Sequence, residues 1–257
     1  MKIPASIRLT YRNIMVNMDT GTMVFMLGLP ALYLLVMGSM FQTLISGVSV
    51  NGETISYTHF LGPGIVAMQT LTAGNIGGSM LWSDRRWGMF EQLLVGPFKR
   101  TDYLLGIMFV AIIFTLGGSF VMLVLSEAIS GGFILTAISI TLTVLALVIG
   151  TILFSALFLI ISTIAKTMQA YNTITILLFF ILDFASSIFY TITPQTPLPV
   201  RLMALGNPLT YVIDVVRNSL DYTPTISTLY DLLIISVITA ILFAIARQLY
   251  QNIKMGI

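Results

Sequence analysis

Few residues of this chain could perform covalent chemistry, and none falls in a catalytic pattern. Asp183 and Asp231 could form the carboxylate pair of an intramembrane protease, but the accompanying G-x-G-D motif is absent. The motifs H-E-x-x-H and G-x-S-x-G are absent too, and the chain has one histidine, His59, and no cysteine. The phosphate-binding loop G-x-x-x-x-G-K-[ST] is also missing. We therefore expect no enzyme activity, no metal site and no ATP hydrolysis from this chain alone.

Charged side chains gather instead in one stretch. Residues 82–103, WSDRRWGMFEQLLVGPFKRTDY, carry four of the twelve Lys and Arg residues and lie between two long apolar runs. Their helical pattern ends at Gly96 and Pro97, and its apolar face consists of Trp87, Phe90, Leu93 and Leu94. We expect this helix to lie crosswise beneath a membrane and to turn its polar residues toward a soluble partner, namely Arg85, Arg86, Glu91 and Gln92. The alternative is a solvated loop whose basic residues only set the orientation of the protein.

Composition indicates which solvent surrounds the chain. Of 257 residues, 57% are apolar and 9% charged, and the mean hydropathy is +0.97, so a globule of 28.2 kDa would have too little polar surface for water. The apolar runs are continuous and lack the alternation of barrel strands, which favours helices. We expect an all-α integral membrane protein with one domain, 1–257, and six transmembrane helices at residues 23–45, 59–81, 104–126, 137–161, 170–192 and 226–246.

The basic residues predict the orientation of these spans. Ten Lys and Arg residues fall on one side of the predicted topology, and only Arg201 and Arg217 fall on the other. Loops rich in Lys and Arg stay in the cytoplasm, so we expect a multi-pass protein of the cell membrane with both termini cytoplasmic. The first span exceeds the apolar core of a signal peptide and no small-x-small cleavage site follows it, so we expect it to remain in the protein.

Residues 1–22 predict a helix that lies in the membrane interface. Arg8 and Arg12 flank a stripe of mostly apolar residues at helical spacing, Ile3, Ile7, Tyr11, Ile14 and Met18. The stripe can sink among lipid headgroups while the arginines meet anionic lipid, and Asp19 and Gly21 mark a break before the first span. The alternative is a plain cytoplasmic lead-in.

The segment 193–225 is too polar and too rich in proline to span a membrane, although it holds many residues of buried type. Asn207 can cap a helix that begins at Pro208, and Asp214 and Arg217 can pair at i, i+3 along that helix. Irregular backbone at membrane depth needs protein or water around it. The alternative is an amphipathic helix that rests on the outer leaflet.

Two features inside the predicted spans concern packing. Asp183 lies in the outer half of the fifth span, where an isolated carboxylate costs about 2.5–3.5 kcal/mol at mid-helix depth. We expect it to line a dimer interface or an outer vestibule; the alternative is a shorter span whose Asp183 reaches the headgroups. In the second span, two overlapping small-xxx-small pairs predict the close approach of another helix, and they consist of Ala73, Gly74, Gly77 and Gly78.

Three motifs that occur in order along the chain carry a family resemblance. FLGPG at residues 60–64 opens the second span, DRRWGMFEQLLVGP fills residues 84–97, and NPLTY at residues 207–211 precedes Asp214 and Arg217. In order and spacing, over nearly the whole chain, they resemble the type-2 ABC-transporter permeases, which are transmembrane subunits of ATP-driven transporters. The FLGPG opening is more similar to the drug- and lipid-export branch than to the polysaccharide branch.

The resemblance implies a permease that dimerises with an identical or related second copy and binds two cytoplasmic ATP-binding subunits. It implies export of an apolar or amphipathic cargo, such as a drug-like molecule, a lipid or a glycolipid. No cofactor is then expected on this chain, because ATP and Mg²⁺ bind to the partner ATPase. Residues 1–22 correspond to the elbow helix, and residues 82–103 correspond to a coupling loop whose ATPase-contacting residues are Arg85, Arg86, Trp87, Phe90, Glu91 and Arg100.

Within that loop, the resemblance assigns Glu91 to a polar contact with the ATPase and supplies no role for Trp87. It also implies that short exoplasmic re-entrant helices within 193–225 close the outer end of the path, with the residues Asn207, Pro208, Tyr211, Asp214 and Arg217. Two other functions stay open. The first is an ion-gradient-driven secondary transporter, which would ordinarily show two related halves; these are not visible in the sequence. The second is a non-transporting membrane scaffold subunit, because the sequence does not reveal turnover.

Overall fold

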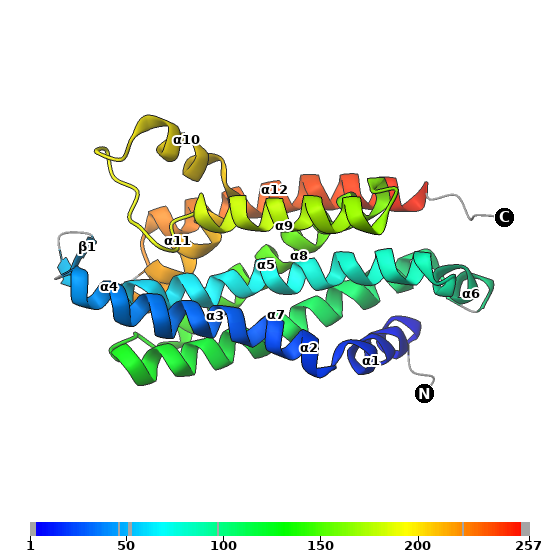
Figure 1. Cartoon of the computed structure of the whole chain (residues 1–257), viewed down its shortest axis with the longest axis horizontal. Coiled ribbons are helices and arrows are strands. Elements are labelled where there is room, and N and C mark those ends of the chain that lie inside the picture. The colour runs from blue at the N-terminus through cyan, green and yellow to red at the C-terminus, as the bar shows by residue number, and fades with distance from the viewer. Residues whose placement is uncertain (1–3, 46, 51–52, 97, 223, 253–257) are drawn as a thin grey trace.

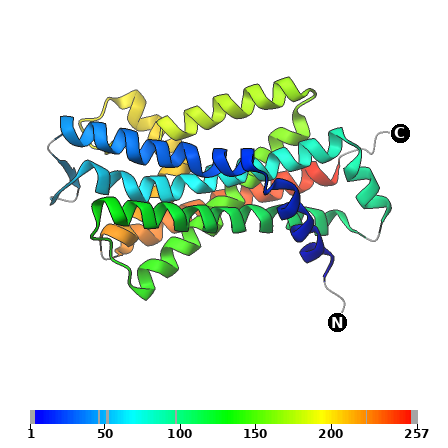
Figure 2. The same ribbon diagram turned by 60° about the horizontal axis from the view of Figure 1, so that its bottom comes forward.

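The computed structural model describes residues 4–45, 47–50, 53–96, 98–222 and 224–252, and its long helices run along one common axis (Figure 1). One end of the molecule, which we call the termini end, holds α1 (Ala5–Asn17), α6 (Met89–Val95) and the first and last described residues (Figures 1 and 2). The opposite, far end holds α10 (Leu198–Gly206), α11 (Pro208–Asp221) and a short antiparallel pair, β1 (Val48–Val50) and β2 (Glu53–Ile55). This strand pair has no counterpart in the sequence predictions.

The first long helix runs through Thr20–Leu44 as one rod. It comprises α2 (Thr20–Met23), α3 (Leu29–Leu32) and α4 (Gly38–Leu44), joined by two wider π-helical turns at Val24–Gly28 and Tyr33–Met37. Asp19 caps its start, since the carboxylate accepts from the backbone N–H groups of Gly21 and Thr22 at 2.9 and 3.1 Å. The predicted break at Asp19 is therefore confirmed.

The described part of the chain forms five further long helices: α5 (Tyr57–Arg86), α7 (Arg100–Ser130), α8 (Ala137–Ile164), α9 (Met168–Phe184) and α12 (Ile226–Gln251). Within the described residues, four helices are long and apolar enough to cross a membrane, namely Thr20–Leu44, α7, α8 and α12. The all-α membrane class is confirmed. The count of six crossings stays a prediction, because it also needs α5, which is less apolar, and α9, which is 17 residues long.

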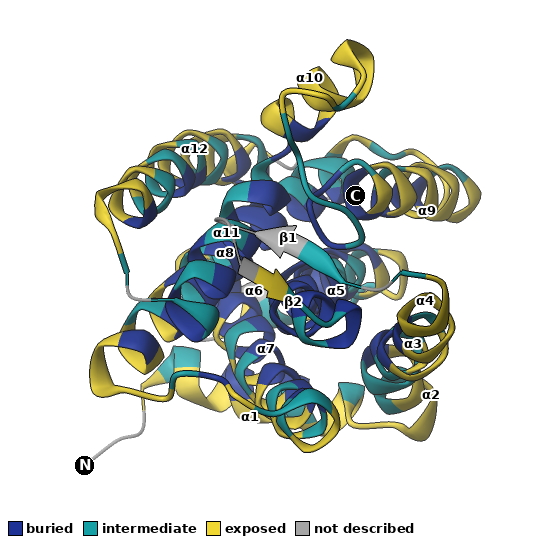
Figure 3. Ribbon diagram, turned by 90° about the vertical axis from the view of Figure 1, so that its left-hand side faces the viewer, coloured by how far each residue is buried: buried dark blue, intermediate teal, exposed yellow. Residues whose placement is uncertain are grey.

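Helix α5 can contain more polar residues than the other long helices because protein surrounds it on most sides. Most of its side chains are buried, and Figure 3 shows it among the other helices, whose yellow, exposed faces point outward. Gly74 and Gly78 let α5 approach α8, since a Cβ at these positions would lie 2.9 and 2.8 Å from the backbone carbonyl carbons of Phe154 and Phe158. The close packing that the small-residue pairs predict is thus confirmed.

The predicted fifth span needs a correction. It was expected over residues 170–192, but α9 ends at Phe184 and residues 185–197 are not helical. At about 1.5 Å per residue, α9 is about 25 Å long, slightly short of a hydrocarbon core of about 30 Å. Ser186 contributes to the helix end, because its hydroxyl donates to the Asp183 carbonyl at 2.6 Å and competes with the helical hydrogen bonds.

Helix α1 lies at the termini end and packs on α7. Leu9 is 2% exposed, and its Cβ would lie 3.0 Å from a Cβ placed on Gly106 of α7. The opposite side of α1 exposes apolar side chains, among them Ile7, Tyr11 and Met15. A helix with one face on the bundle and an exposed apolar face suits the interface between lipid and water.

Candidate functional site

The turn between α5 and α6 positions the stretch that the sequence marked as a docking surface. Gly88 has φ of 67°, in the left-handed region that favours glycine, and a Cβ there would meet no other atom within 4 Å. Glycine is therefore needed for the backbone conformation and not for space. The helix begins at Met89, so Trp87, which the sequence pattern placed on the apolar face of this helix, lies before its first residue. Pro97, part of the predicted stop, lies outside the described residues.

Phe90 fixes α6 to the bundle. Its side chain has no exposed surface and makes edge-to-face contacts with Tyr103 at 5.4 Å and Tyr250 at 5.8 Å between ring centroids. Tyr103 belongs to the first turn of α7 and Tyr250 to the last turn of α12, and their rings stack at 6.3 Å. One aromatic cluster, Phe90–Tyr103–Tyr250, therefore joins α6 to two long helices.

The rest of the segment is more open. Trp87 is 79% exposed and Val95 is 87% exposed, while Glu91 is half-buried. The expected apolar face is therefore wrong for Trp87, because the left-handed turn at Gly88 separates it from the helix. Direct contact of Phe90 with a partner is also not supported, since its side chain is fully enclosed. Glu91 Oε2 lacks both solvent contact and a hydrogen-bond donor within the described ranges.

Two of the predicted contact arginines bind their own chain. Arg85 donates to the Ser162 carbonyl at 2.9 Å, near the end of α8. Arg100 donates to the carbonyls of Tyr250 and Gln251, at 3.1 and 2.9 Å, and so caps the end of α12. Positive charge at a helix C-terminus is favourable, because the last carbonyls lack helical donors. Arg86 is exposed, so it is the predicted arginine that is most open to a partner.

An ion pair that sequence reasoning missed ties α1 to the same region. Arg12 makes two hydrogen bonds to the Asp84 carboxylate, at 3.0 and 3.1 Å, and the Tyr103 hydroxyl donates to Asp84 at 2.7 Å. The carboxylate raises the pKa of the Arg12 guanidinium, chiefly through the hydrogen bonds. The single acid at the start of the DRRWG motif was a signal for this contact. Asp84 thus connects α1, the end of α5 and the aromatic cluster.

At the far end, the predicted helix cap is present. Asn207 accepts from the Leu209 backbone N–H at 3.0 Å and donates to the Leu182 carbonyl at 2.6 Å, and Pro208 occupies the first helical position. Tyr211 donates its hydroxyl to the Leu205 carbonyl at 2.7 Å and so holds α10 and α11 together. Most residues of α11 are buried. The alternative of an amphipathic helix that rests on a lipid surface is therefore wrong for α11.

Arg217 lies inside the bundle at 5% exposure. Its guanidinium donates to the carbonyls of Ser187 and Phe60, at 2.8 and 3.3 Å, and lies 4.0 Å from the centre of the Phe60 ring. The predicted partner Asp214 lies 3.7 Å away and also accepts from the Ser187 hydroxyl at 3.0 Å. Arg217 thereby connects α11 to the start of α5 and to the segment after α9.

A second buried contact at this end was not predicted. His59 Nε2 lies 3.3 Å from Asp221 Oδ1, and His59 Nδ1 lies 2.8 Å from the Gly131 carbonyl oxygen. These contacts join the start of α5, the end of α7 and the end of α11. Sequence alone offered only the fact that His59 is the single histidine.

Asp183 is fully buried, and neither carboxylate oxygen has a hydrogen-bond partner in the described part of the chain. It lies within electrostatic range of Tyr33 in the first long helix. The expected position at a dimer interface or outer vestibule is therefore wrong, and so is the alternative among headgroups. The Asp183 side chain is enclosed by its own chain. The segment that follows α9 is buried in part as well, since Ile188 has no exposed surface.

Comparison with known protein families places the chain. The profile of the family described as ABC-2 type transporter matches residues 7–220, which include most of α1, the α6 segment and nearly all of α11. No curated protein is significantly similar to the chain.

Proposed function

The chain belongs to the ABC-2 type transporter family and is a membrane permease subunit, and from this premise we propose that it exports an apolar or amphipathic molecule with the energy of ATP hydrolysed by a separate subunit. Both termini and α6 face the cytoplasm in this proposal, in line with the excess of basic residues at the termini end. ATP and Mg²⁺ bind to the partner, because this chain lacks a phosphate-binding loop.

The arrangement of α6 is the observation that carries the proposal. An ATPase can grip the open side of the segment, where Arg86, Trp87 and Glu91 lie, while Phe90 remains locked in the aromatic cluster. A displacement of α6 is then transmitted through Tyr103 to α7 and through Tyr250 to α12, because closely packed aromatic rings are nearly incompressible. Glu91 is half-buried, and its Oε2 atom has no donor in the described ranges. Because that oxygen has no solvent contact, the side chain must turn outward to accept a hydrogen bond from the partner.

The far end supplies the outer closure. Arg217 binds Phe60 and Ser187, so a shift of α5 relative to α11 must break or rearrange these hydrogen bonds. Asn207, Pro208, Tyr211, Asp214 and Arg217 hold α10 and α11 in place as the re-entrant closure of the path. A cavity of about 340 Å³ between α9 and α10 is lined by apolar side chains such as Phe180, Phe184 and Met203, which suits an apolar cargo.

A second permease copy completes the transporter in this proposal. The outward face of α9 exposes Ile174, Leu177, Phe180 and Ile181, an apolar stripe that can pack against lipid or against a second copy. Two copies are needed if the path runs between subunits, because the core of the single chain is filled by α5.

Copurification from native membranes tests the proposal. We expect a soluble ATPase to copurify with the permease, and we expect Glu91→Ala to remove cargo stimulation of ATP hydrolysis without loss of membrane insertion. Thr101→Ala is the matched control, because Thr101 is exposed in the first turn of α7 and lies outside the predicted contact residues. Unchanged stimulation in Glu91→Ala would exclude the coupling role. Recovery of no ATPase, with transport that follows an ion gradient, would favour the secondary transporter.

Orientation is tested separately. The chain contains no cysteine, so Gln92→Cys introduces a unique site for a membrane-impermeant maleimide. Labelling only after the membrane is opened is the expected result, and labelling from outside intact cells would reverse the topology.

A further inference from the structure

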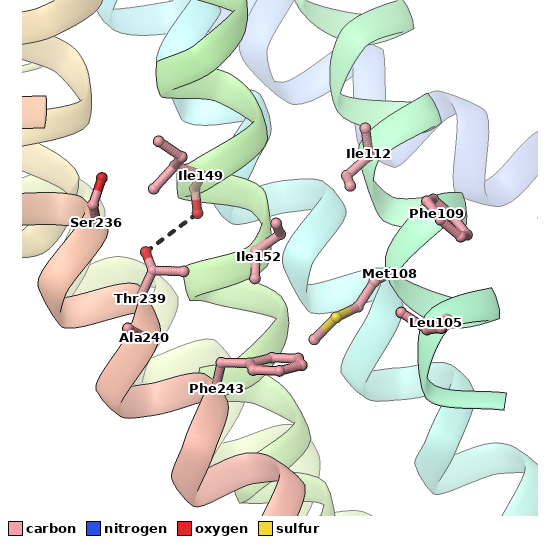
Figure 4. A pocket seen from close by; sticks show the side chains of 10 residues that line it. All are labelled: Leu105, Met108, Phe109, Ile112, Ile149, Ile152, Ser236, Thr239, Ala240 and Phe243. Carbon is pink, nitrogen blue, oxygen red and sulfur yellow. Dashed lines mark hydrogen bonds between the residues drawn. The ribbon is translucent and has the colours of Figure 1, made fainter. Parts of the chain in front are cut away.

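A groove of about 370 Å³ opens on the outer side of the bundle between α7 and α12, with α8 as its floor (Figure 4). It lies in the half of the bundle nearer the termini end, since its lining starts five residues after the first residue of α7. The side chains that shape it are Leu105, Phe109, Ile112, Ile152, Ala240 and Phe243.

The groove offers an occupant only apolar contact. Its two hydroxyls are already used within α12, because Thr239 donates to the Ile235 carbonyl at 2.6 Å and Ser236 donates to the Leu232 carbonyl at 2.7 Å. Figure 4 shows the Thr239 hydroxyl turned toward the Ile149 carbonyl, at 3.4 Å. An occupant that must accept hydrogen bonds would find no free donor on these side chains, whereas a hydrocarbon chain needs none.

The distance along α12 from the groove to an exposed cation, Arg247, selects the kind of hydrocarbon, although Arg247 itself does not line the groove. Ser236, Ala240, Phe243 and Arg247 follow one another at i, i+4, i+7 and i+11 and so lie on one face of α12. From Ser236 to Arg247 the helix rises about 16 Å, close to the half-thickness of about 15 Å of a bilayer hydrocarbon core. Arg247 is exposed and belongs to the last turns of α12, so it would lie near the headgroups of a leaflet at the termini end.

Because the rise along α12 to Arg247 matches the half-thickness of the hydrocarbon core, we propose that the groove binds an anionic phospholipid of the leaflet at the termini end. One acyl chain lies between α7 and α12, and the phosphate lies beside Arg247. The chain covers the apolar floor on α8, and the guanidinium supplies the opposite charge. The bound lipid fills a space between two helices that both contact α6 through the aromatic cluster. The proposal needs a bilayer and not an ATPase, so it stands or falls independently of the proposed function.

Native mass spectrometry of the full-length, delipidated permease titrated with dipalmitoyl phosphatidylglycerol tests this site. Arg247→Ala should weaken binding about fivefold, the factor for about 1 kcal/mol per basic residue at an anionic surface. Ala240→Phe should abolish the saturable site, because the added ring fills the groove at an exposed position where folding is not at risk. Two matched controls should bind as the wild type does: Ile241→Phe, which adds a ring on another exposed face of α12, and Lys166→Ala, which removes a different exposed basic residue.

Three results would overturn the proposal. The first is wild-type affinity in Ala240→Phe, which would place the lipid elsewhere. The second is equal binding of phosphatidylglycerol and dipalmitoyl phosphatidylcholine together with no effect of Arg247→Ala, which would show ordinary annular lipid. The third is displacement of lipid by a neutral apolar solute whose binding is blocked by Ala240→Phe and unaffected by Arg247→Ala, which would make the groove a cargo site.

Discussion

Removing the Phe90 ring should release α6 from the bundle without unfolding the membrane helices. Phe90 has no exposed surface, and truncation of such a residue to alanine costs about 3–5 kcal/mol. Isolated helices shorter than about 12–15 residues are marginal in water, and α6 has seven residues, so it has little stability of its own. The lost packing therefore shifts the equilibrium between α6 packed on the bundle and α6 released from it by a factor of about 10² to 10³, or somewhat more.

Hydrogen–deuterium exchange on the purified Phe90→Ala permease measures this shift. Amides of residues 92–95 should exchange at least 100-fold faster than in the wild type, while peptides from α7 and α8 keep their protection. Trp87→Ala is the matched control, because Trp87 lies three residues away and is 79% exposed, and it should leave the exchange of α6 unchanged. Protection of α6 that changes less than about tenfold in Phe90→Ala would refute the argument that the aromatic cluster holds this helix.

Three further predictions concern the contacts around this framework. Arg12→Ala removes the charged hydrogen bonds to Asp84 and should lower the free energy of unfolding of the purified protein by about 1.5–3 kcal/mol. A double-mutant cycle with Asp84→Ala should show coupling, and additive effects would exclude the pair. Gly78→Ala should destabilise by about 1–3 kcal/mol, because the new Cβ meets the Phe158 backbone at 2.8 Å, and an unchanged melting temperature would show that α5 and α8 separate freely. Asp183→Asn should raise the melting temperature, since it removes a buried carboxylate without a donor in the described ranges; a clear drop would reveal a partner for the charge.

Predictions that depend on local chemistry were the most successful ones. Asp19 caps a helix because its carboxylate reaches backbone N–H groups two and three residues ahead, and Asn207 with Pro208 does the same for α11. Gly74 and Gly78 pack against α8 because residues four apart lie on one helix face. The two caps involve only neighbours along the chain, and the shared face of the two glycines follows from their spacing, so the residue types are sufficient to predict both. That α8 is the helix packed on this face came from the structure.

Predictions of which residues face a partner were less successful. Phe90 and Trp87 were assigned to one apolar face. The left-handed turn at Gly88 separates them, so Phe90 is buried and Trp87 is exposed. Arg85 and Arg100 were expected to face a soluble protein, yet each caps the end of another helix of the same chain. Helical periodicity describes faces within one helix and contains no information on which neighbour covers each face.

The amino-acid sequence alone determined that this protein is a helical membrane protein and that it contains no phosphate-binding loop motif, because hydropathy, periodicity and motif spacing are properties of contiguous residues. Only the tertiary structure decided that Arg12 pairs with Asp84, 72 residues away, that Asp183 is enclosed by its own chain and that α7 and α12 leave a groove above α8. These contacts depend on how rigid helices rotate and tilt against one another. A small rotation of one helix changes all of them while it leaves the local pattern of the sequence unaltered.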